Sequence, residues 1–141
     1  MKKEYKNIMV AVDGSEQSYN AVQEAVEVTK RNGGKLQIVT VKDNKRYYGM
    51  AGAGFVETPG LDQMAQEILN EASRLVGDKI EVTLQELSGT PKYRIVSFAE
   101  EHNIDLIVIG STGAGVIDKL MLGSTTQYVV SHAPCNVMVI K

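Results

Sequence analysis

Short apolar runs alternate along the chain with longer amphipathic segments. Residues 7–12 (NIMVAV) and 105–109 (DLIVI) are almost continuously apolar, which is typical of strands buried on both faces. Residues 35–41 (KLQIVTV) and 136–140 (NVMVI) are two further short strand candidates. Residues 79–87 alternate between apolar and polar positions, which indicates a half-exposed strand at the edge of a sheet. The pattern therefore predicts five strands.

Segments between these strands carry the signals of helices. The clearest covers residues 61–76, where apolar residues recur at three- and four-residue spacing. Hydroxyl residues, proline and glycine mark helix ends, because their side chains or backbone angles suit those positions. The expected helix starts are Ser15 or Ser18, Thr90-Pro91 and Ser124, and the expected ends are residues 32–34, Gly77, about His102 and about Ser131.

The order of elements, βαβαβαβαβ, predicts a single α/β domain over residues 1–141. Right-handed crossovers would place helices on both faces of a doubly wound parallel sheet. Two helix pairs with unrelated hairpins would not explain why residues 7–12 and 105–109 are buried on both sides.

Composition and net charge reduce the number of function classes that fit this chain. The net charge of −2 is too small to attract nucleic acid or a membrane surface over long range, so neither is expected as a partner. No apolar segment reaches the roughly 18 residues that a membrane span needs. Cys135 is the single cysteine, which excludes an intramolecular disulfide and favours a reducing compartment. We expect a cytoplasmic protein.

Glycines and hydroxyls follow the fourth strand, in residues 110–126 (GSTGAGVIDKLMLGSTT). In doubly wound sheets, ligands bind outside the carboxyl ends of the strands. Glycine lets backbone N–H groups approach an anion, and a helix N-terminus adds further donors with a partial positive charge. This stretch predicts a phosphate-binding loop.

Three better-known classes do not fit. Val116 stands where a P-loop needs lysine, and Asp118 stands at the third glycine position of a Rossmann dinucleotide motif. A two-component receiver domain needs an acceptor aspartate after the third strand, where residues 88–90 read SGT.

The spacing G-x2-G-x9-G-[ST] is met by Gly110, Gly113, Gly123 and Ser124, between DLIVIG and HAPCNVMVI. Together with NIMVAVDGSEQS near the N-terminus and GTP at residues 89–91, this pattern resembles the universal stress protein family over nearly the whole chain except residues 42–60. The resemblance implies an adenine nucleotide alpha hydrolase-like fold with strand order 3-2-1-4-5. It also implies membership of the ATP-binding branch, with ATP, ADP or AMP as ligand and Mg²⁺ sharing the phosphate charge.

The same resemblance implies a role for each matching position. Beside the adenosine it places Ala11, Val12 and Asp13, with the Asp13 carboxylate reaching the ribose or a metal-bound water. It places the Val41 backbone at the adenine edge, Ile109 and Gly110 under the ribose, and Gly113, Gly123, Ser124, Thr125 and Thr126 at the phosphates. Thr112 stands where many members carry a basic residue; Lys45, Arg46 or Lys119 are candidate replacements.

Simpler interpretations stay open. Residues 13–15 can form only a turn and a helix cap, and Gly110 and Gly113 can be tight-turn glycines. Residues 50–54 (MAGAG) fit either a phosphate lid or an irregular loop. His132 and Cys135 could suggest a nucleophile, but they precede a strand, at the edge opposite the expected site.

We expect a nucleotide-dependent regulator of a stress response that acts through conformational or partner changes, with unidentified protein partners. The alternative is a slow ATP phosphohydrolase or phosphotransferase, although Asp13 is the single carboxylate assigned to the site and no arginine is assigned to the phosphates. In the expected edge strand at 136–140, residues 137–140 (VMVI) are apolar on both faces, and no charged side chain protects the edge before Lys141. This predicts a homodimer paired through strand 136–140.

Overall fold

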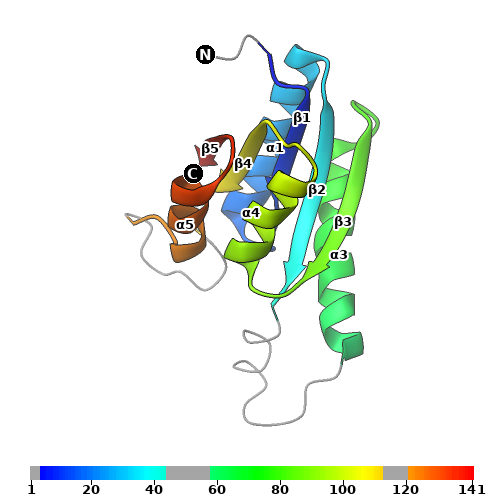
Figure 1. Cartoon of the computed structure of the whole chain (residues 1–141). Coiled ribbons are helices and arrows are strands. Elements are labelled where there is room, and N and C mark those ends of the chain that lie inside the picture. Colours follow the sequence, from blue (N-terminus) through cyan, green and yellow to red (C-terminus); the bar gives the residue numbers. More distant parts are fainter. Residues whose placement is uncertain (1–3, 44–57, 113–120) are drawn as a thin grey trace.

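The computed structural model describes residues 4–43, 58–112 and 121–141. They form a five-stranded parallel sheet between two layers of helices (Figure 1). The sheet order is β3-β2-β1-β4-β5, as the resemblance implied, and the predicted fold class is confirmed. The strands are β1 (Asn7–Ala11), β2 (Lys35–Lys42), β3 (Val82–Ser88), β4 (Leu106–Gly110) and β5 (Asn136–Ile140).

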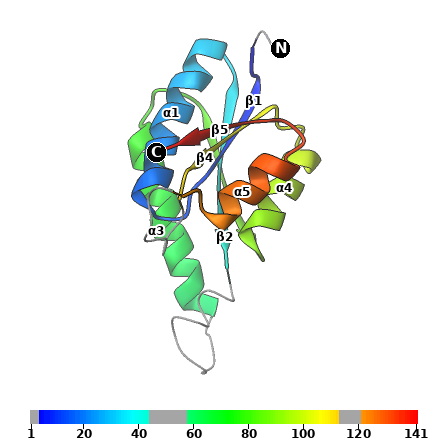
Figure 2. The same cartoon turned by 90° about the vertical axis from the view of Figure 1, so that its left-hand side faces the viewer.

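The helices cover both faces of the sheet, as the alternating order predicts. One layer contains α1 (Glu16–Asn32) and α3 (Thr58–Val76), and the other contains α4 (Pro91–Glu101) and α5 (Ser124–His132). Figure 2 shows the sheet between these two layers.

Alternate residues of the central strand β1 supply both hydrophobic cores. Ile8 and Val10 pack with α1 and α3, whereas Met9 and Ala11 pack with α4 and α5. Ile8, Met9 and Val10 are completely buried. Side chains of a strand point alternately to opposite faces, so a strand covered on both sides must be apolar throughout. This explains the continuous apolar run.

Most helix ends follow the sequence signals. Ser15 rather than Ser18 is the N-cap of α1, because its Oγ accepts the N–H of Ser18 at 3.2 Å. The helix ends at Gly33, whose φ of 61° lies in the left-handed region that glycine tolerates. For α5, the expectation of Ser124 as cap was wrong by one residue: Gly123 is the N-cap, and Ser124 is the first helical residue.

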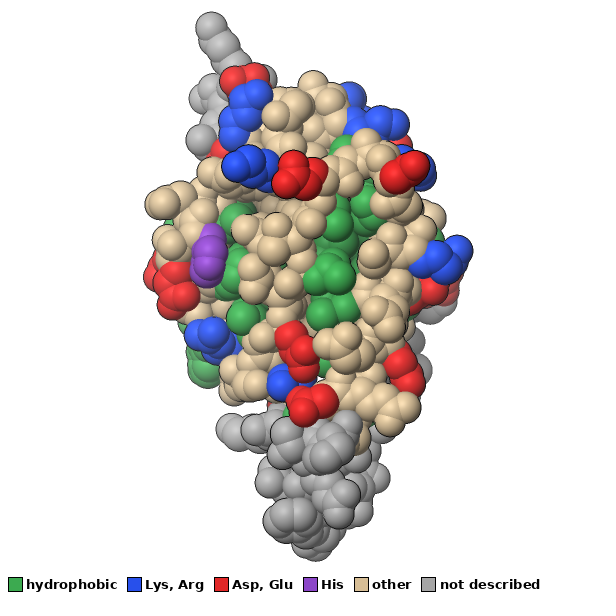
Figure 3. All heavy atoms as spheres, turned by 90° about the vertical axis from the view of Figure 1, so that its right-hand side faces the viewer, with side chains coloured by type: hydrophobic (Ala, Val, Ile, Leu, Met, Phe, Trp, Pro, Cys, Tyr) green, Lys and Arg blue, Asp and Glu red, His purple; other side chains and the backbone are tan. Residues whose placement is uncertain are grey.

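The edge strand β3 begins later than the alternation predicted, because the turn that follows α3 extends through residue 80. Its position at the edge leaves Leu84 40% exposed. Figure 3 shows the side of the molecule on which β3 lies, with hydrophobic side chains at the centre of the face and charged ones around them.

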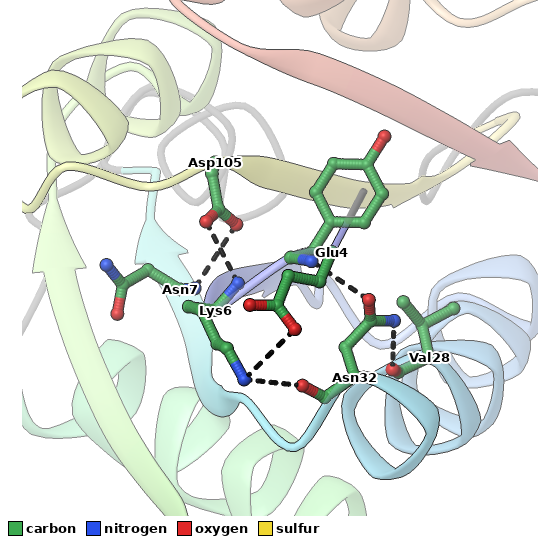
Figure 4. A network of polar contacts seen from close by, with 7 residues as sticks. Glu4, Lys6, Asn7, Val28, Asn32 and Asp105 are labelled. Carbon is green, nitrogen blue, oxygen red and sulfur yellow. Dashed lines mark hydrogen bonds and ion pairs between the residues drawn. The ribbon is translucent and has the colours of Figure 1, made fainter. Parts of the chain in front are cut away.

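Polar contacts join several elements at the amino-terminal edge of the sheet (Figure 4). The Asp105 carboxylate accepts the backbone N–H groups of Lys6 at 2.9 Å and Asn7 at 3.2 Å. Lys6 Nζ donates to the carbonyl oxygen of Asn32, and the Asn32 side chain accepts the N–H of Tyr5. These bonds join the start of β1 to the end of α1 and to the residue that precedes β4.

Candidate functional site

A cavity of about 250 Å³ opens at the carboxyl-terminal edge of the sheet. It lies beside the ends of β1, β2 and β4, and so includes the β1–β4 boundary, where the order of strands reverses. Ligands of doubly wound sheets bind at this place. Gly113 lies outside the described residues; the other predicted ligand-binding residues all line the cavity: Ala11, Val12, Asp13, Val41, Ile109, Gly110, Thr112, Gly123, Ser124, Thr125 and Thr126.

The end of β1 carries Asp13 into a tight hydrogen-bonded turn. Asp13 Oδ1 accepts the N–H of Ser15 at 2.9 Å, and the Asp13 N–H donates to Ser18 Oγ at 3.3 Å. Residues 13–15 are therefore a turn and a helix cap, as the simpler interpretation held. The half-buried Asp13 still lines the cavity, so the two interpretations are compatible.

Ser18 is a site residue that the sequence analysis missed. Its side chain is buried, lines the cavity, and donates to the carbonyl oxygen of Ser15 at 2.8 Å while accepting from Asp13. A polar residue on the buried face of α1 was the available signal, because such a residue needs a hydrogen-bond partner.

Gly110 lies against the backbone at the start of α1. A Cβ atom added to it would come within 2.9 Å of the Gln17 carbonyl carbon and 3.0 Å of the Ser18 nitrogen. Real Cβ atoms essentially never come that close to backbone. Close approach of β4 to α1 is thus sufficient to require glycine here.

The first turn of α5 presents backbone donors to the cavity. Gln127 is the residue whose N–H bonds to the Gly123 carbonyl at 3.0 Å. The N–H groups of residues 124–126 precede it and have no acceptor within the helix, and they carry the partial positive charge of a helix N-terminus. Because the N-cap is Gly123, no capping side chain covers these groups.

The hydroxyls of this turn differ in their availability. Thr126 is 3% exposed, and its Oγ1 donates to the carbonyl oxygen of Gly110 at 2.7 Å. Its proton is therefore used within the protein. Ser124 is exposed and Thr125 half-buried, and both line the cavity. We expect only these two hydroxyls to donate to a ligand.

Apolar side chains form most of the remaining walls, and the sequence pattern predicted no role in the site for them. Most of them belong to α3 and α4, and the others to the end of β2 and the residue after it. The predicted apolar spacing of residues 61–76 was the signal, but it does not show where a sheet stops. The additional lining residues are the apolar Val39, Leu61, Met64, Ala65, Ile68, Pro91 and Ile95 and the polar Thr40 and Asp43.

Lys42 is the single lysine or arginine among the described lining residues. Its Nζ lies 2.7 Å from Asp62 Oδ1 and 3.1 Å from Glu86 Oε1. A hydrogen bond to Asp62, and a smaller contribution from a hydrogen bond to Glu86, raise the pKa of Lys42 above its ordinary value. Two carboxylates thus balance this charge. The candidate cations Lys45, Arg46 and Lys119 lie outside the described residues, as does the loop at residues 50–54.

The described residues contain no group of three or more His, Cys, Asp and Glu side chains able to hold a metal ion. Asp13 can supply one carboxylate oxygen at the cavity. Mg²⁺ is commonly bound by one or two carboxylates together with ligand phosphates and water. The donor set fits a magnesium ion that arrives with a nucleotide.

His132 and Cys135 lie away from the cavity. His132 is exposed, stacks on the Tyr128 ring, and its Nδ1 lies 2.9 Å from the Tyr128 carbonyl oxygen. Cys135 lies beside Asp105 and Asn136 in a hollow at the opposite edge of the sheet. Neither residue lines the cavity at the carboxyl-terminal edge. Along the described stretches, no helix is long and apolar enough to cross a membrane.

The fold and the site define a doubly wound α/β protein. Its cavity lies where the strand order reverses, and the N-terminus of a helix opens into it. The universal stress protein family model matches residues 4–141, and the chain belongs to this family. A Staphylococcus aureus (strain USA300) protein, assigned by its name to the universal stress proteins, is 40% identical over 143 residues, covering 97% of this chain and 84% of that protein.

Two solved structures are similar in fold. Universal stress protein UspA from Lactobacillus plantarum has 31% identity and a TM-score of 0.80, covering 99% of this chain and 100% of that chain. The universal stress protein from Archaeoglobus fulgidus, solved in complex with dAMP, has 25% identity and a TM-score of 0.74, covering 97% of this chain and 98% of that chain.

Proposed function

We propose that this protein binds ATP, ADP or AMP in the cavity at the carboxyl edge of the sheet. The observation that carries the proposal is the continuity of this cavity, which joins an apolar slot beside β2 to the open N-terminus of α5. An adenine ring needs an apolar slot, and phosphates need backbone donors and positive potential. The dAMP complex of the Archaeoglobus fulgidus protein supports adenine nucleotides as the ligand class.

In this proposal the adenine lies beside the backbone of Val41, against the apolar wall of α3. The ribose lies near Asp13, Ile109 and Gly110. The phosphates lie at Gly113 and at residues 123–125, where the N–H groups of α5 precede the first intrahelical bond. The buried Thr112 adds no charge, and Thr126 holds the helix rather than the ligand.

Magnesium would accompany ATP and bind Asp13 together with phosphate oxygens. Its chemistry there is charge neutralisation, which the site needs because its lining lysine is paired with two carboxylates. The chain's own contribution is the Asp13 carboxylate, whose orientation is fixed by the N–H of Ser15.

We favour a regulatory role in the cytoplasm over rapid phosphoryl transfer. Phosphoryl transfer requires a positioned base or water-holding group and charge stabilisation on the transferred phosphoryl group. Among the described residues no arginine lines the cavity. Nucleotide occupancy would then act by changing conformation or the affinity for protein partners. Steady-state turnover above about 1 s⁻¹, the low end of common enzyme rates, would instead support a hydrolase.

A homodimer paired through β5 belongs to the same proposal. This strand is the outer neighbour of β4, and Val137, Met138, Val139 and Ile140 are all only half-buried. An unpaired apolar edge favours association with a second copy. Light scattering at micromolar concentration should give twice the chain mass, and a monomer would contradict this part of the proposal.

Two measurements test nucleotide binding. Native mass spectrometry of freshly purified protein should detect an adenine nucleotide that is released on denaturation. Titration calorimetry of stripped protein should then give saturable binding of ATP with Mg²⁺, and weaker binding of GTP under the same conditions. If stripped, folded protein binds no adenine nucleotide at millimolar concentration, the proposed function is wrong.

A further inference from the structure

Lys42 lies at the end of β2, where its side chain joins three elements around the cavity. Asp62 belongs to α3 and Glu86 to β3, and both carboxylates contact the same ammonium group. We propose that Lys42 is a positioning residue for the adenine end of the site: it holds the first turns of α3 against the sheet so that this helix forms the wall of the slot. This inference rests on the proposed function.

The contacts form a continuous chain from the helix to the edge strand. Lys42 Nζ donates to Asp62 Oδ1 at 2.7 Å and lies 3.1 Å from Glu86 Oε1. The other carboxylate oxygen of Glu86 accepts from Gln66 Nε2 at 3.0 Å. Asp62 and Gln66 are four residues apart and so lie on one side of the helix. Two successive turns of α3 are therefore tied to β2 and β3.

The wall of the cavity is formed by the same two turns. Leu61, Met64 and Ala65 line the cavity, and each is adjacent to or within two residues of Asp62 or Gln66 in the sequence. Leu61 is 7% exposed and Ala65 3% exposed, so their positions are fixed by close contact. A small movement of this part of α3 would change the width of the slot directly. The ion pairs thus set the position of an apolar surface.

The location of Lys42 argues against direct contact with phosphates. The open N-terminus of α5 lies beside the cavity with the end of β4, and β1 separates β4 from β2. Two strand spacings amount to roughly 10 Å. Lys42 also has its charge balanced by two carboxylates, and its side chain is 17% exposed. It should affect the base rather than the phosphates.

The test compares three ligands: adenosine, AMP and ATP with Mg²⁺, each titrated calorimetrically into nucleotide-free protein. We expect Lys42→Met to weaken all three by the same factor, about fivefold or more. Lys42→Arg should restore affinity to within about twofold, since arginine can bond both carboxylates. Lys35→Met is the matched control, because Lys35 is an exposed lysine at the other end of β2, and it should leave all three affinities unchanged.

The two partners provide a second set of variants. Asp62→Asn weakens the link to α3 and should reproduce most of the loss, whereas Glu86→Gln leaves the Lys42–Asp62 pair and should cost less. A loss confined to ATP would make Lys42 a phosphate ligand and overturn the inference. A lower melting temperature with unchanged affinities in both Lys42→Met and Asp62→Asn would also overturn it. If the unmodified protein binds none of the three ligands, the proposed function itself fails.

Discussion

Thr126 Oγ1 donates a hydrogen bond to the carbonyl oxygen of Gly110 over 2.7 Å, in a buried position. This bond joins the first turn of α5 to the last residue of β4. The N-terminus of a helix binds an anion well only if its free N–H groups keep a fixed position relative to the rest of the cavity. Thr126 supplies that fixed position, and it does so with the hydroxyl that sequence reasoning assigned to the phosphates.

Replacing Thr126 by the isosteric valine should therefore lower stability as well as binding. The buried Gly110 carbonyl would lose its side-chain donor, which costs about 1–3 kcal/mol in the free energy of unfolding. Urea denaturation of the nucleotide-free protein measures this loss, and Thr126→Ser, which keeps the hydroxyl, is the control. Equal stability of the valine variant and the unmodified protein would show that the bond contributes nothing.

Gly110→Ala should destabilise the protein in the absence of any ligand. Its Cβ would meet the backbone of Gln17 and Ser18 at 2.9–3.0 Å, so α1 must move away from β4. Overpacking of this kind costs about 1–3 kcal/mol. Thermal and urea denaturation of the stripped protein provide the measurement. A stable variant that had merely lost nucleotide affinity would instead assign Gly110 to the ligand.

Gly123→Val should instead lower the affinity for nucleotide and leave the protein folded. Gly123 has φ −63° and ψ 156°, an extended conformation that any residue adopts, so the substitution brings no backbone strain. Gly123 lines the cavity, so a branched side chain there would occupy the space that phosphates need beside the α5 donors. We expect ATP affinity to fall more than tenfold, or about 1.4 kcal/mol, in a variant that remains folded by circular dichroism. Unchanged ATP affinity would remove Gly123 from the phosphate site.

Asp13→Asn distinguishes the contribution of the metal to affinity from that of the nucleotide. Asparagine keeps the oxygen that accepts the Ser15 N–H but removes the charge that would hold Mg²⁺. The gain in ATP affinity on adding Mg²⁺ should therefore shrink about tenfold, while AMP binding in EDTA should be unchanged or stronger. Calorimetry with and without Mg²⁺ measures both quantities. An undiminished magnesium effect would exclude Asp13 as a metal ligand.

The Lys42 pairs should be insensitive to pH until the alkaline range. The pKa of Lys42 is raised above its ordinary value of 10.5 by its hydrogen bonds to Asp62 and Glu86. A group whose folded pKa is raised contributes stability that is fully present below the unfolded pKa and is lost as pH rises through the folded pKa. The difference in melting temperature between the unmodified protein and Lys42→Met should be constant from pH 7 to about pH 9.5 and shrink above pH 10.5. A difference that already disappears near pH 8 would contradict the assignment.

The fold could be predicted because each strand and helix has its own local signal. The continuous apolar run of β1 requires cover on both faces, and Ser15 and Gly33 mark the ends of α1 through their own side chain and backbone. The late start of β3 was missed because alternation in residues 79–87 continues through a turn. Apolar residues occur in turns as well as strands, and Ile80 packs on the core from outside the strand.

The site was predictable where the chain carries polar or glycine residues at strand ends. Its apolar wall was not, because Leu61 and Met64 have the same helical spacing as the core residues that follow them. Lys42 was missed for a different reason: its role depends on Asp62 and Glu86, which are distant in sequence and meet only through the sheet order. The position of Thr126 likewise depends on a contact with Gly110 that spacing alone does not reveal.

The close fit between Gly110 and the backbone of α1 has a consequence for how such chains are classified. Selection for a well-folded sheet would retain this glycine in a descendant that had abandoned nucleotides altogether, since alanine there collides with Gln17 whether or not a ligand is present. Its occurrence is therefore a poor marker of ligand use. A diagnostic motif for this architecture should give weight to positions such as Gly123, whose backbone angles do not by themselves require glycine.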